Sequence, residues 1–571
     1  MSQSTPPASS GPEPTGESLG GTDTPQKSSR RGLAIGGAAL AVALVGGGAY
    51  AAWSFLSSGP QPAEVLPAST LGYLAVDVDP GGSQKIEAFR TLRKFPTLKE
   101  ELGLDTDDDL RELIVDEFLS DSDCDLSFED DFAPWVGKKV ALAAVPAAGD
   151  DVAAVIVVAV DDEGAAEDGL QAIKECDDDL GWEFRDGFAL VSPTQEQAEG
   201  VVAALDKGTL ADDDDYAEWI AEAGGDGFVT GYVSAEATPY ILDLAEEFSD
   251  IADMSIQPSS GGSTENPFAG MSDEELESMG LDPELVEQLY GDDDAAAVPD
   301  TEGLEERLKQ ERAQLEESLE DFEGAAMTLR FDDGALRLEA VAGGIGAEGE
   351  TPKLNDLVES LPASTGVLLA MGVHPDWAEQ ITSVVTDVLG EGAVDTVERA
   401  TGLDLPGDLT TLLGDAVALA VDGNLDAERI ANSFDPTDVP VGLRMLGDAD
   451  EIGGVLDKLI ASLGADGDLL TVERGDDGAA VGLAPGWVEA LAEGGDLSDN
   501  DRFDDVVSGD GDVSGVFFVD FNGPWLGSLL DALLGGDAPE VEDNLEPLRA
   551  LGVSSWVEDD RTRFVVEIST D

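Results

Sequence analysis

Carboxylates are the most numerous groups in this sequence that could do chemistry. The 571 residues include 123 Asp and Glu against 29 Lys and Arg, which gives a formal net charge of −94. Two facing carboxylates can hydrolyse a glycoside, one as the acid and the other as base or nucleophile. Sequence spacing alone does not show which of so many acids face one another. A hydrolase of envelope glycan or lipid that uses paired carboxylates therefore stays open as an alternative function.

One acidic segment approaches the pattern of a calcium-binding loop. Asp121, Asp123 and Asp125 alternate as in an EF-hand, but Leu126 stands where that loop needs glycine and Phe132 where it needs glutamate. The chain's two cysteines and one histidine are too few for a site of nitrogen and sulfur ligands alone. We therefore expect no metal site and no cofactor, with diffuse cation binding around the acidic surface.

The motifs of nucleophilic and metal-dependent catalysis are missing from the sequence. Because His374 is the single histidine, an HExxH zinc site is excluded, and no GxSxG, SxxK or Walker sequence occurs. His374 precedes Pro375 at the end of an expected strand, where a structural role is the simpler interpretation. We assign no catalytic residue, and we favour a non-enzymatic binding or scaffold function whose molecular activity the sequence does not identify.

The two cysteines are Cys124 and Cys176, and both follow the apolar segment described below. Two cysteines in an oxidising compartment more often form a disulfide than a reactive site. We therefore predict a disulfide between Cys124 and Cys176.

Basic residues are concentrated between residues 85 and 99. A helix that ends at Pro96 would place Arg90, Arg93 and Lys94 on one face, three or four residues apart. One hypothesis is that this face neutralises acids of its own domain. The other is that it binds an anionic lipid headgroup or wall polymer, since basic residues near an anionic surface are attracted to it.

The overall charge limits the other partners. A polyanion is repelled by the phosphate backbone, so we predict no nucleic-acid binding. The sequence contains no signal that identifies an oligomeric state.

The apolar segment Leu33–Leu56 is the element that must position the rest of the chain. Its 24 residues contain no charge and would span about 36 Å as a helix, enough for a hydrocarbon core of about 30 Å. Lys27, Arg30 and Arg31 precede it, which favours a cytoplasmic tail over residues 1–32 and an extracytoplasmic remainder. A cleavable signal ending near Ala51 is the alternative, but the run is long for one. We expect a single-pass protein of the cell membrane.

The part after the anchor contains an internal repeat. Residues 66–80 (LPASTLGYLAVDVDP) match residues 361–375 (LPASTGVLLAMGVHP) at nine of fifteen positions, and further segments match in the same order. We predict a linker over 57–65, a first repeat over 66–345 with insertions at about 81–125 and 249–299, and a homologous second repeat over 354–571.

Turn signals indicate the fold of each repeat. Short apolar strands alternate with amphipathic helices, and Asp-Gly pairs at 186–187, 333–334 and 477–478 are typical of β-hairpins. A doubly wound parallel sheet would need a helix after nearly every strand. We therefore predict an α+β fold, with a transmembrane helix followed by two tandem homologous domains of mainly antiparallel sheet and amphipathic helices.

Three segments resemble a known family. They are LPASTLGYLAVDVDP (66–80), QKIEAFRTLRKFP (84–96) and WVGKKVALAAV (135–145). With the preceding apolar segment, they resemble the actinobacterial membrane-anchored proteins that are classified only as a domain of unknown function. The resemblance implies an envelope location, and it implies no activity and no catalytic residue.

Overall fold

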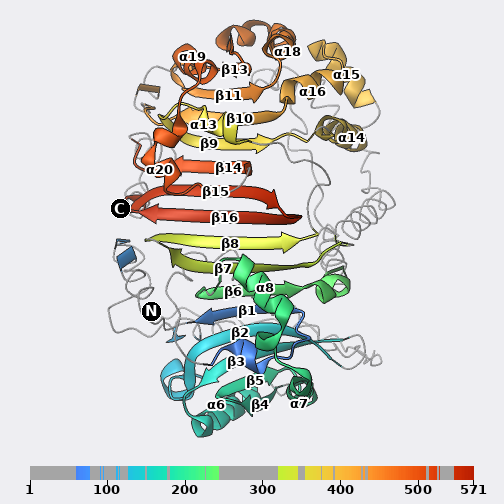
Figure 1. Ribbon diagram of the computed structural model, residues 1–571, viewed down its shortest axis with the longest axis vertical. Helices are drawn as coiled ribbons and strands as arrows, with labels where there is room; N and C mark the ends of the chain where they lie inside the picture. Colours follow the sequence, from blue (N-terminus) through green and yellow to red (C-terminus); the bar gives the residue numbers. More distant parts are fainter. Residues whose placement is uncertain are drawn as a thin grey trace, which may run out of the picture.

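A computed structural model was obtained for the chain (Figure 1). It describes residues 60–77, 90–91, 94–95, 111–112, 115, 126–147, 151–176, 180–225, 227–242, 319, 321–332, 334–344, 354–374, 376–389, 392–425, 429–430, 435–508, 513–523, 526 and 545–571.

The described residues form one 16-stranded sheet, in the spatial order β12-β13-β11-β10-β9-β14-β15-β16-β8-β7-β6-β1-β2-β3-β5-β4. All of the neighbouring pairs are antiparallel. The strands of the first half are β1 (Gly72–Asp77), β2 (Val136–Pro146), β3 (Val152–Val160), β4 (Gly181–Arg185), β5 (Phe188–Ser192), β6 (Val229–Ser234), β7 (Gly324–Asp332) and β8 (Ala335–Gly343). Those of the second half are β9 (Thr365–Gly372), β10 (Ala416–Asp422), β11 (Val441–Leu446), β12 (Thr471–Arg474), β13 (Gly478–Gly482), β14 (Val513–Asp520), β15 (Leu548–Glu558) and β16 (Arg561–Thr570).

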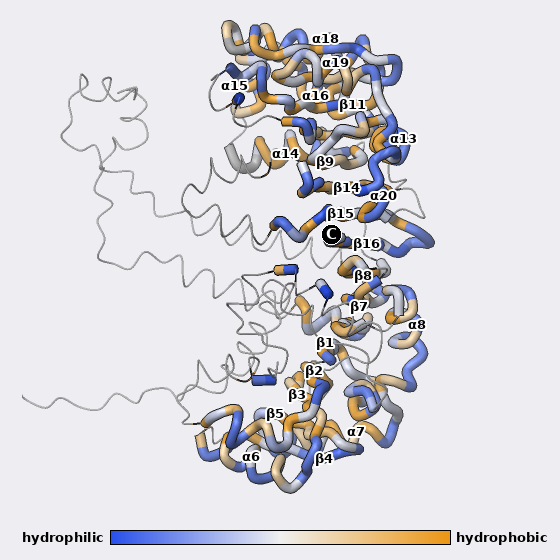
Figure 2. The backbone as a smooth tube through the Cα atoms, turned by 90° about the vertical axis from the view of Figure 1, so that its left-hand side faces the viewer, coloured by the Kyte–Doolittle hydropathy of each residue, from blue (hydrophilic) through white to orange (hydrophobic). Residues whose placement is uncertain are grey.

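Helices lie on both faces of the sheet, as Figure 2 shows for α7, α8, α13 and α20 on one side and α6 and α14 on the other. The α-helices are α6 (Glu163–Cys176), α7 (Gln195–Ala204), α8 (Asp214–Glu222), α13 (Asn355–Glu359), α14 (Trp377–Leu389), α15 (Gly392–Thr401), α16 (Gly407–Leu413), α18 (Ala449–Ser462), α19 (Pro485–Glu493) and α20 (Asp501–Asp504). Short helical turns that the text uses are η2 (Pro62–Val65), η3 (Phe128–Phe132) and η6 (Ala235–Ala237).

The two halves of the sheet have the same strand order. Numbered from the first strand of its own half, each half reads 4-5-3-2-1-6-7-8 across the sheet. The halves meet where β8 pairs with β16, the last strand of each half (Figure 1). The edge strands of the whole sheet are therefore β4 and β12, the fourth strand of each half.

Side-chain alternation along the strands gives the sheet an apolar core on each face. Val157 of β3 lies in a cluster that α7 and α8 cover, whereas its neighbour Val158 packs against the cluster beneath α6 and η3. In the second half, Ala418 of β10 lies in the cluster beneath α13, α19 and α20, and Val417 packs against the cluster beneath α18. Neighbouring residues of a strand point to opposite faces, so both faces carry apolar residues that need cover.

The hairpins that the Asp-Gly pairs predict are present. β4 and β5 pair across Asp186 and Gly187, whose φ angles of 47° and 87° fit a tight turn that favours glycine. β7 pairs with β8 and β12 with β13 in the same way. The prediction of a mainly antiparallel α+β architecture is confirmed.

The expected linker over 57–65 differs from what the structure describes. Residues 62–65 form η2, in which Pro62, Ala63 and Val65 are buried. Apolar residues at three of these four positions explain the difference, because the core of the first half includes Ala63 and Val65. The folded part therefore begins before Leu66.

Several predictions fall on residues that the structure does not describe. The tail over 1–32, the anchor Leu33–Leu56 and the insertion at 249–299 lie outside the described residues, as does most of the insertion at 81–125. Among the residues that are described, no helix is both long and apolar enough to cross a membrane.

Candidate functional site at the junction of the two half-sheets

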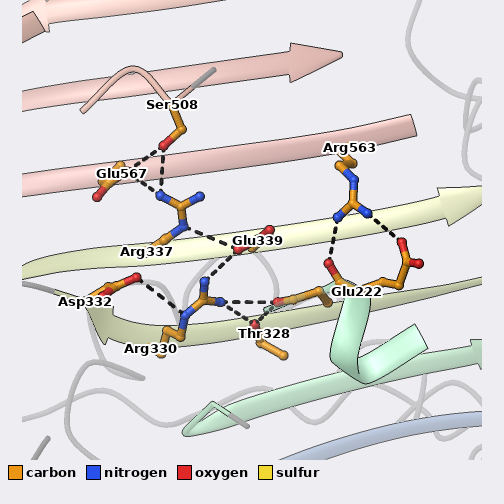
Figure 3. A network of polar contacts seen from close by, with 10 residues as sticks. Glu222, Thr328, Arg330, Asp332, Arg337, Glu339, Ser508, Arg563 and Glu567 are labelled. Carbon is orange, nitrogen blue, oxygen red and sulfur yellow. Dashed lines mark hydrogen bonds and ion pairs between the residues drawn. The ribbon is translucent and has the colours of Figure 1, made fainter. Parts of the chain in front are cut away.

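The largest cluster of charged side chains that the structure describes lies where β8 meets β16 (Figure 3). Register places Arg330 of β7 opposite Arg337 of β8, and Arg337 opposite Glu567 of β16. Side chains directly opposite one another share a face of the sheet. The charges are therefore on the face that α8 covers, between the apolar clusters of the two halves.

Arg337 connects the two halves directly. Its guanidinium donates to Glu339 Oε2 at 3.3 Å, to Glu567 Oε2 at 2.9 Å and to Ser508 Oγ at 2.8 Å. Ser508 Oγ in turn donates to Glu567 Oε2 at 3.0 Å. The side chains of Glu339 and Glu567 are each 11% exposed, so water screens these ion pairs less than it would at the surface.

Arg330 extends the cluster within the first half. It donates to Glu339 Oε2 at 2.6 Å and to the hydroxyl of Thr328 at 2.9 Å. A further bond reaches the carbonyl of Ala223, which also accepts the Thr328 hydroxyl. The loop after α8 is therefore fixed to β7 by both side chains.

A second set of contacts crosses the junction from α8. Glu222 accepts from Arg563 at 2.5 Å, and the two acids of α8, Glu218 and Glu222, bind Arg561 at 2.7 Å and 2.5 Å. The Arg561 guanidinium also lies 4.6 Å from the ring centroid of Trp219, a cation–π distance. Hydrogen bonds to Glu218 and Glu222 raise the pKa of Arg561, so this residue stays charged.

Two glycines make room for Trp219. A Cβ at Gly324 would lie 2.6 Å from Trp219 Nε1, and one at Gly343 would lie 2.7 Å from its Cη2. Gly324 also has a φ of 131°, which favours glycine. The first residue of β7 and the last of β8 are thus fitted to the ring that supports Arg561.

The register of β8 and β16 is symmetric about its centre. When the strands are aligned from their first residues, Ala335 and Arg561, Glu339 corresponds to Val565. Those two residues oppose each other in the sheet. Such a pairing, in which corresponding positions meet at one point, is the geometry of a twofold interface.

Cross-half contacts follow the same symmetry. Arg337 and Arg563 occupy corresponding positions on β8 and β16, and each reaches a residue of the opposite half that lies before the sixth strand of that half. Arg337 binds Ser508, which precedes β14, and Arg563 binds Glu222, which precedes β6. Each half therefore holds the other through an arginine.

Glu339 and Glu567 are the two acids that the network brings together. Burial raises the pKa of Glu567, while the charge of Arg337 and the Ser508 hydroxyl act in the opposite direction. A raised pKa is expected of a general acid. Arg337 binds both carboxylates, however, so the arrangement neutralises the two acids rather than leaving them facing a substrate.

The raised pKa of Glu567 leads to a prediction about pH. The native protein binds this proton more tightly than the unfolded chain does, so the stabilisation it contributes is present at low pH and lost as pH rises through the folded pKa. The free energy of unfolding of the wild type, relative to Glu567→Gln, should therefore fall between about pH 4 and about pH 7. Urea titrations across this range measure the difference, and a difference that grows with pH would contradict the assignment.

The predicted basic face is described at two of its three residues. Arg90 is exposed, Arg93 lies outside the described residues, and Lys94 Nζ donates to Thr570 Oγ1 at 2.9 Å. Burial lowers the pKa of Lys94, while the nearby charge of Asp571 acts in the opposite direction. Lys94 thus contacts the end of β16, and the choice between self-neutralisation and anion binding stays a prediction.

The other predicted residues are only partly described. Cys176 is exposed at the end of α6, but Cys124 lies outside the described residues, so the disulfide stays a prediction. His374 Nδ1 accepts from the backbone N–H of Asp376 at 3.4 Å, next to the start of α14. No group of His, Cys, Asp and Glu that could hold a metal ion occurs among the described residues.

Sequence reasoning missed the junction arginines. A signal was available, because Arg337 and Glu339, like Arg561 and Arg563, alternate with apolar or small residues at the period of a strand. This spacing predicts a charged stripe on one face of each strand. It does not predict which distant strand supplies the opposite charge.

Residues 34–214 match the model of a family described as "Protein of unknown function (DUF3352)". The match runs from the apolar segment to the first residue of α8, and the resemblance to a family without an assigned function is confirmed over these residues. No curated protein matches the chain, and no solved structure does.

Proposed function

We propose that this protein is an envelope-anchored, non-enzymatic scaffold or binding protein with a highly acidic extracytoplasmic region. Residues 1–32 form its cytoplasmic tail and residues 33–56 its single membrane span. Support for the topology comes from the uncharged run of 24 residues and from the bases that precede it. The acidic composition keeps such a surface soluble.

The extracytoplasmic part consists, in this proposal, of two tandem homologous domains. Matched sequence segments, the common strand order of the two half-sheets and the symmetric register of β8 and β16 all support it. A duplicated gene whose product once paired as a twofold dimer would leave this pattern.

The single observation that carries the scaffold function is the way in which the halves are joined. Backbone pairing of β8 with β16 makes the two half-sheets one continuous sheet, and charged side chains cross that seam in both directions. Sixteen strands spaced about 4.8 Å apart extend over roughly 70 Å. A long, rigid platform suits the assembly of partners along its surface more than it suits a single enclosed reaction.

One sheet face offers a place where partners could bind. Leu369 of β9 and Leu419 of β10 oppose each other and are each 43% exposed, and Phe564 of β16 is 41% exposed on the same face. Large exposed apolar side chains that lie together are typical of interaction surfaces.

Site-specific photocrosslinking in native membranes tests the proposal. A photoreactive residue at Leu369 or Leu419 should give discrete protein adducts, whereas one at the exposed Arg185 on edge strand β4 should not. Hydrolysis of envelope glycan or lipid by the purified chain, lost in Glu339→Gln or Glu567→Gln, would instead establish the alternative hydrolase. The position of Arg337 between those two acids argues against that outcome.

A further inference from the structure

The chain is held firmly where it enters the folded part. Lys139 Nζ donates to the carbonyl of Pro60 at 3.1 Å and lies 3.9 Å from the Asp77 carboxylate. Lys139 is only 6% exposed, and the buried turn η2 follows directly. Pro60 is therefore fixed to the edge of the sheet where β1 ends and β2 begins.

The proposed anchor ends close to this point. Three residues, 57–59, separate Leu56 from Pro60. Even a fully extended chain spans about 14 Å over these four steps. If the anchor is membrane-spanning, the edge that carries Pro60 must lie next to the membrane surface.

The same edge of the sheet includes the end of β16. Strands β6, β7 and β8 lie between β1 and β16, and every neighbouring pair is antiparallel, so β1 and β16 run in the same direction and end at one edge (Figure 1). Lys94 contacts Thr570 there. Asn522, which follows β14, donates to Asp571 at 3.4 Å and marks the same edge in the second half.

Basic residues gather at this edge in an otherwise acidic protein. Lys138 is exposed beside the buried Lys139, and Arg90 is exposed four residues before Lys94. Two acids of the edge face bases, Asp77 with Lys139 and Asp571 with Lys94. A chain with a net charge of −94 would otherwise be repelled by an anionic bilayer, so bases placed nearest the bilayer reduce that repulsion.

We propose that the edge formed by Arg90, Lys94, Lys138 and Pro60 lies on the membrane and binds the headgroups of anionic phospholipids. This inference rests on the proposed anchoring. Arg90 and Lys138 contact the headgroups, and Lys94 and Lys139 are positioning residues that hold the segment and the chain entry in place. The short tether favours lipid over a wall polymer, because it keeps the edge at the bilayer.

Headgroup quenching of a fluorescent label tests the orientation. The full chain, with Cys124→Ser and Cys176→Ser, is placed in vesicles that contain spin-labelled headgroups and carries one label at Asn522→Cys or at Ala235→Cys. Ala235 is exposed in η6, after a strand that runs opposite to β1, so it lies at the other edge. We expect several-fold stronger quenching at position 522. Equal quenching, or stronger quenching at 235, would overturn the orientation.

Lipid composition and charge reversal test the recognition. Quenching at position 522 should be stronger in equal parts of phosphatidylcholine and phosphatidylglycerol than in phosphatidylcholine alone, and Arg90→Glu with Lys138→Glu should abolish the difference. Arg185→Glu, at the exposed and distant strand β4, is the matched control and should preserve it. No dependence on phosphatidylglycerol, or a dependence only on added anionic wall polymer, would overturn lipid binding. A chain that leaves carbonate-washed vesicles would overturn the anchoring as well, which separates the two failures.

Discussion

Arg337→Ala should lower the free energy of unfolding of the extracytoplasmic part by about 3–5 kcal/mol, because it leaves Glu339 and Glu567 facing each other without their shared cation. The cost comes mainly from the two buried carboxylates, not from the strength of the pair that is lost. Chemical denaturation near neutral pH measures it. Arg185→Ala removes an exposed pair with Asp186 and should cost less than about 1 kcal/mol.

A double variant distinguishes the two explanations of that loss. Arg337→Met combined with Glu567→Met removes both charges and leaves Glu339 paired with Arg330 at 2.6 Å. Most of the lost stability should return, since apolar pairs often replace buried ion pairs at little cost. If the double variant is as unstable as Arg337→Ala, the carboxylates are not the cause, and the role given to Arg337 is wrong.

The second half alone, residues 354–571, should form a twofold dimer through β16. In the register that β16 uses with β8, residue 567 opposes the position that corresponds to Arg563. Two copies of β16 in that register would therefore place Arg563 opposite Glu567 twice, with Val565 facing its own copy at the centre. Opposite charges directly across a sheet stabilise the pair. Sedimentation of the purified fragment measures the association.

The first half alone supplies the matched control. Two copies of β8 in the same register would place Glu339 directly opposite Glu339, which is destabilising. We therefore expect residues 60–345 to stay monomeric under conditions where 354–571 dimerises. Val565→Glu in the second fragment should abolish its dimer in the same way. A folded, monomeric 354–571 fragment would show that the register symmetry does not encode an interface.

Much of the architecture could be predicted from the sequence because it is local. An Asp-Gly pair between two apolar strands determines a hairpin within a few residues, and Asp186 and Gly187 adopt the turn that these residue types favour. The alternation of apolar residues likewise indicates which strand positions face a core.

The seam between the half-sheets could not be predicted in this way. Arg337 and Glu567 are 230 residues apart, and the pairing of β8 with β16 depends on the whole register of two strands. With 123 acids in the chain, no spacing rule selects Glu567 as the partner of one arginine. The buried turn η2 was missed for a different reason, since four residues beside a Gly-Pro pair contain too little periodicity to indicate a folded element.

Hydrogen exchange of the seam is the most direct test that the two halves form one rigid platform. Amides of residues 336–342 and 562–568, on β8 and β16, would be compared in the full chain with those of β1 and β2 and with those of the edge strands β4 and β12. We predict that the seam exchanges as slowly as β1 and β2, because a continuous interior strand pair opens only in larger unfolding events. Seam amides that exchange as fast as those of β4 and β12 would mean that the halves separate in solution, and would contradict the platform.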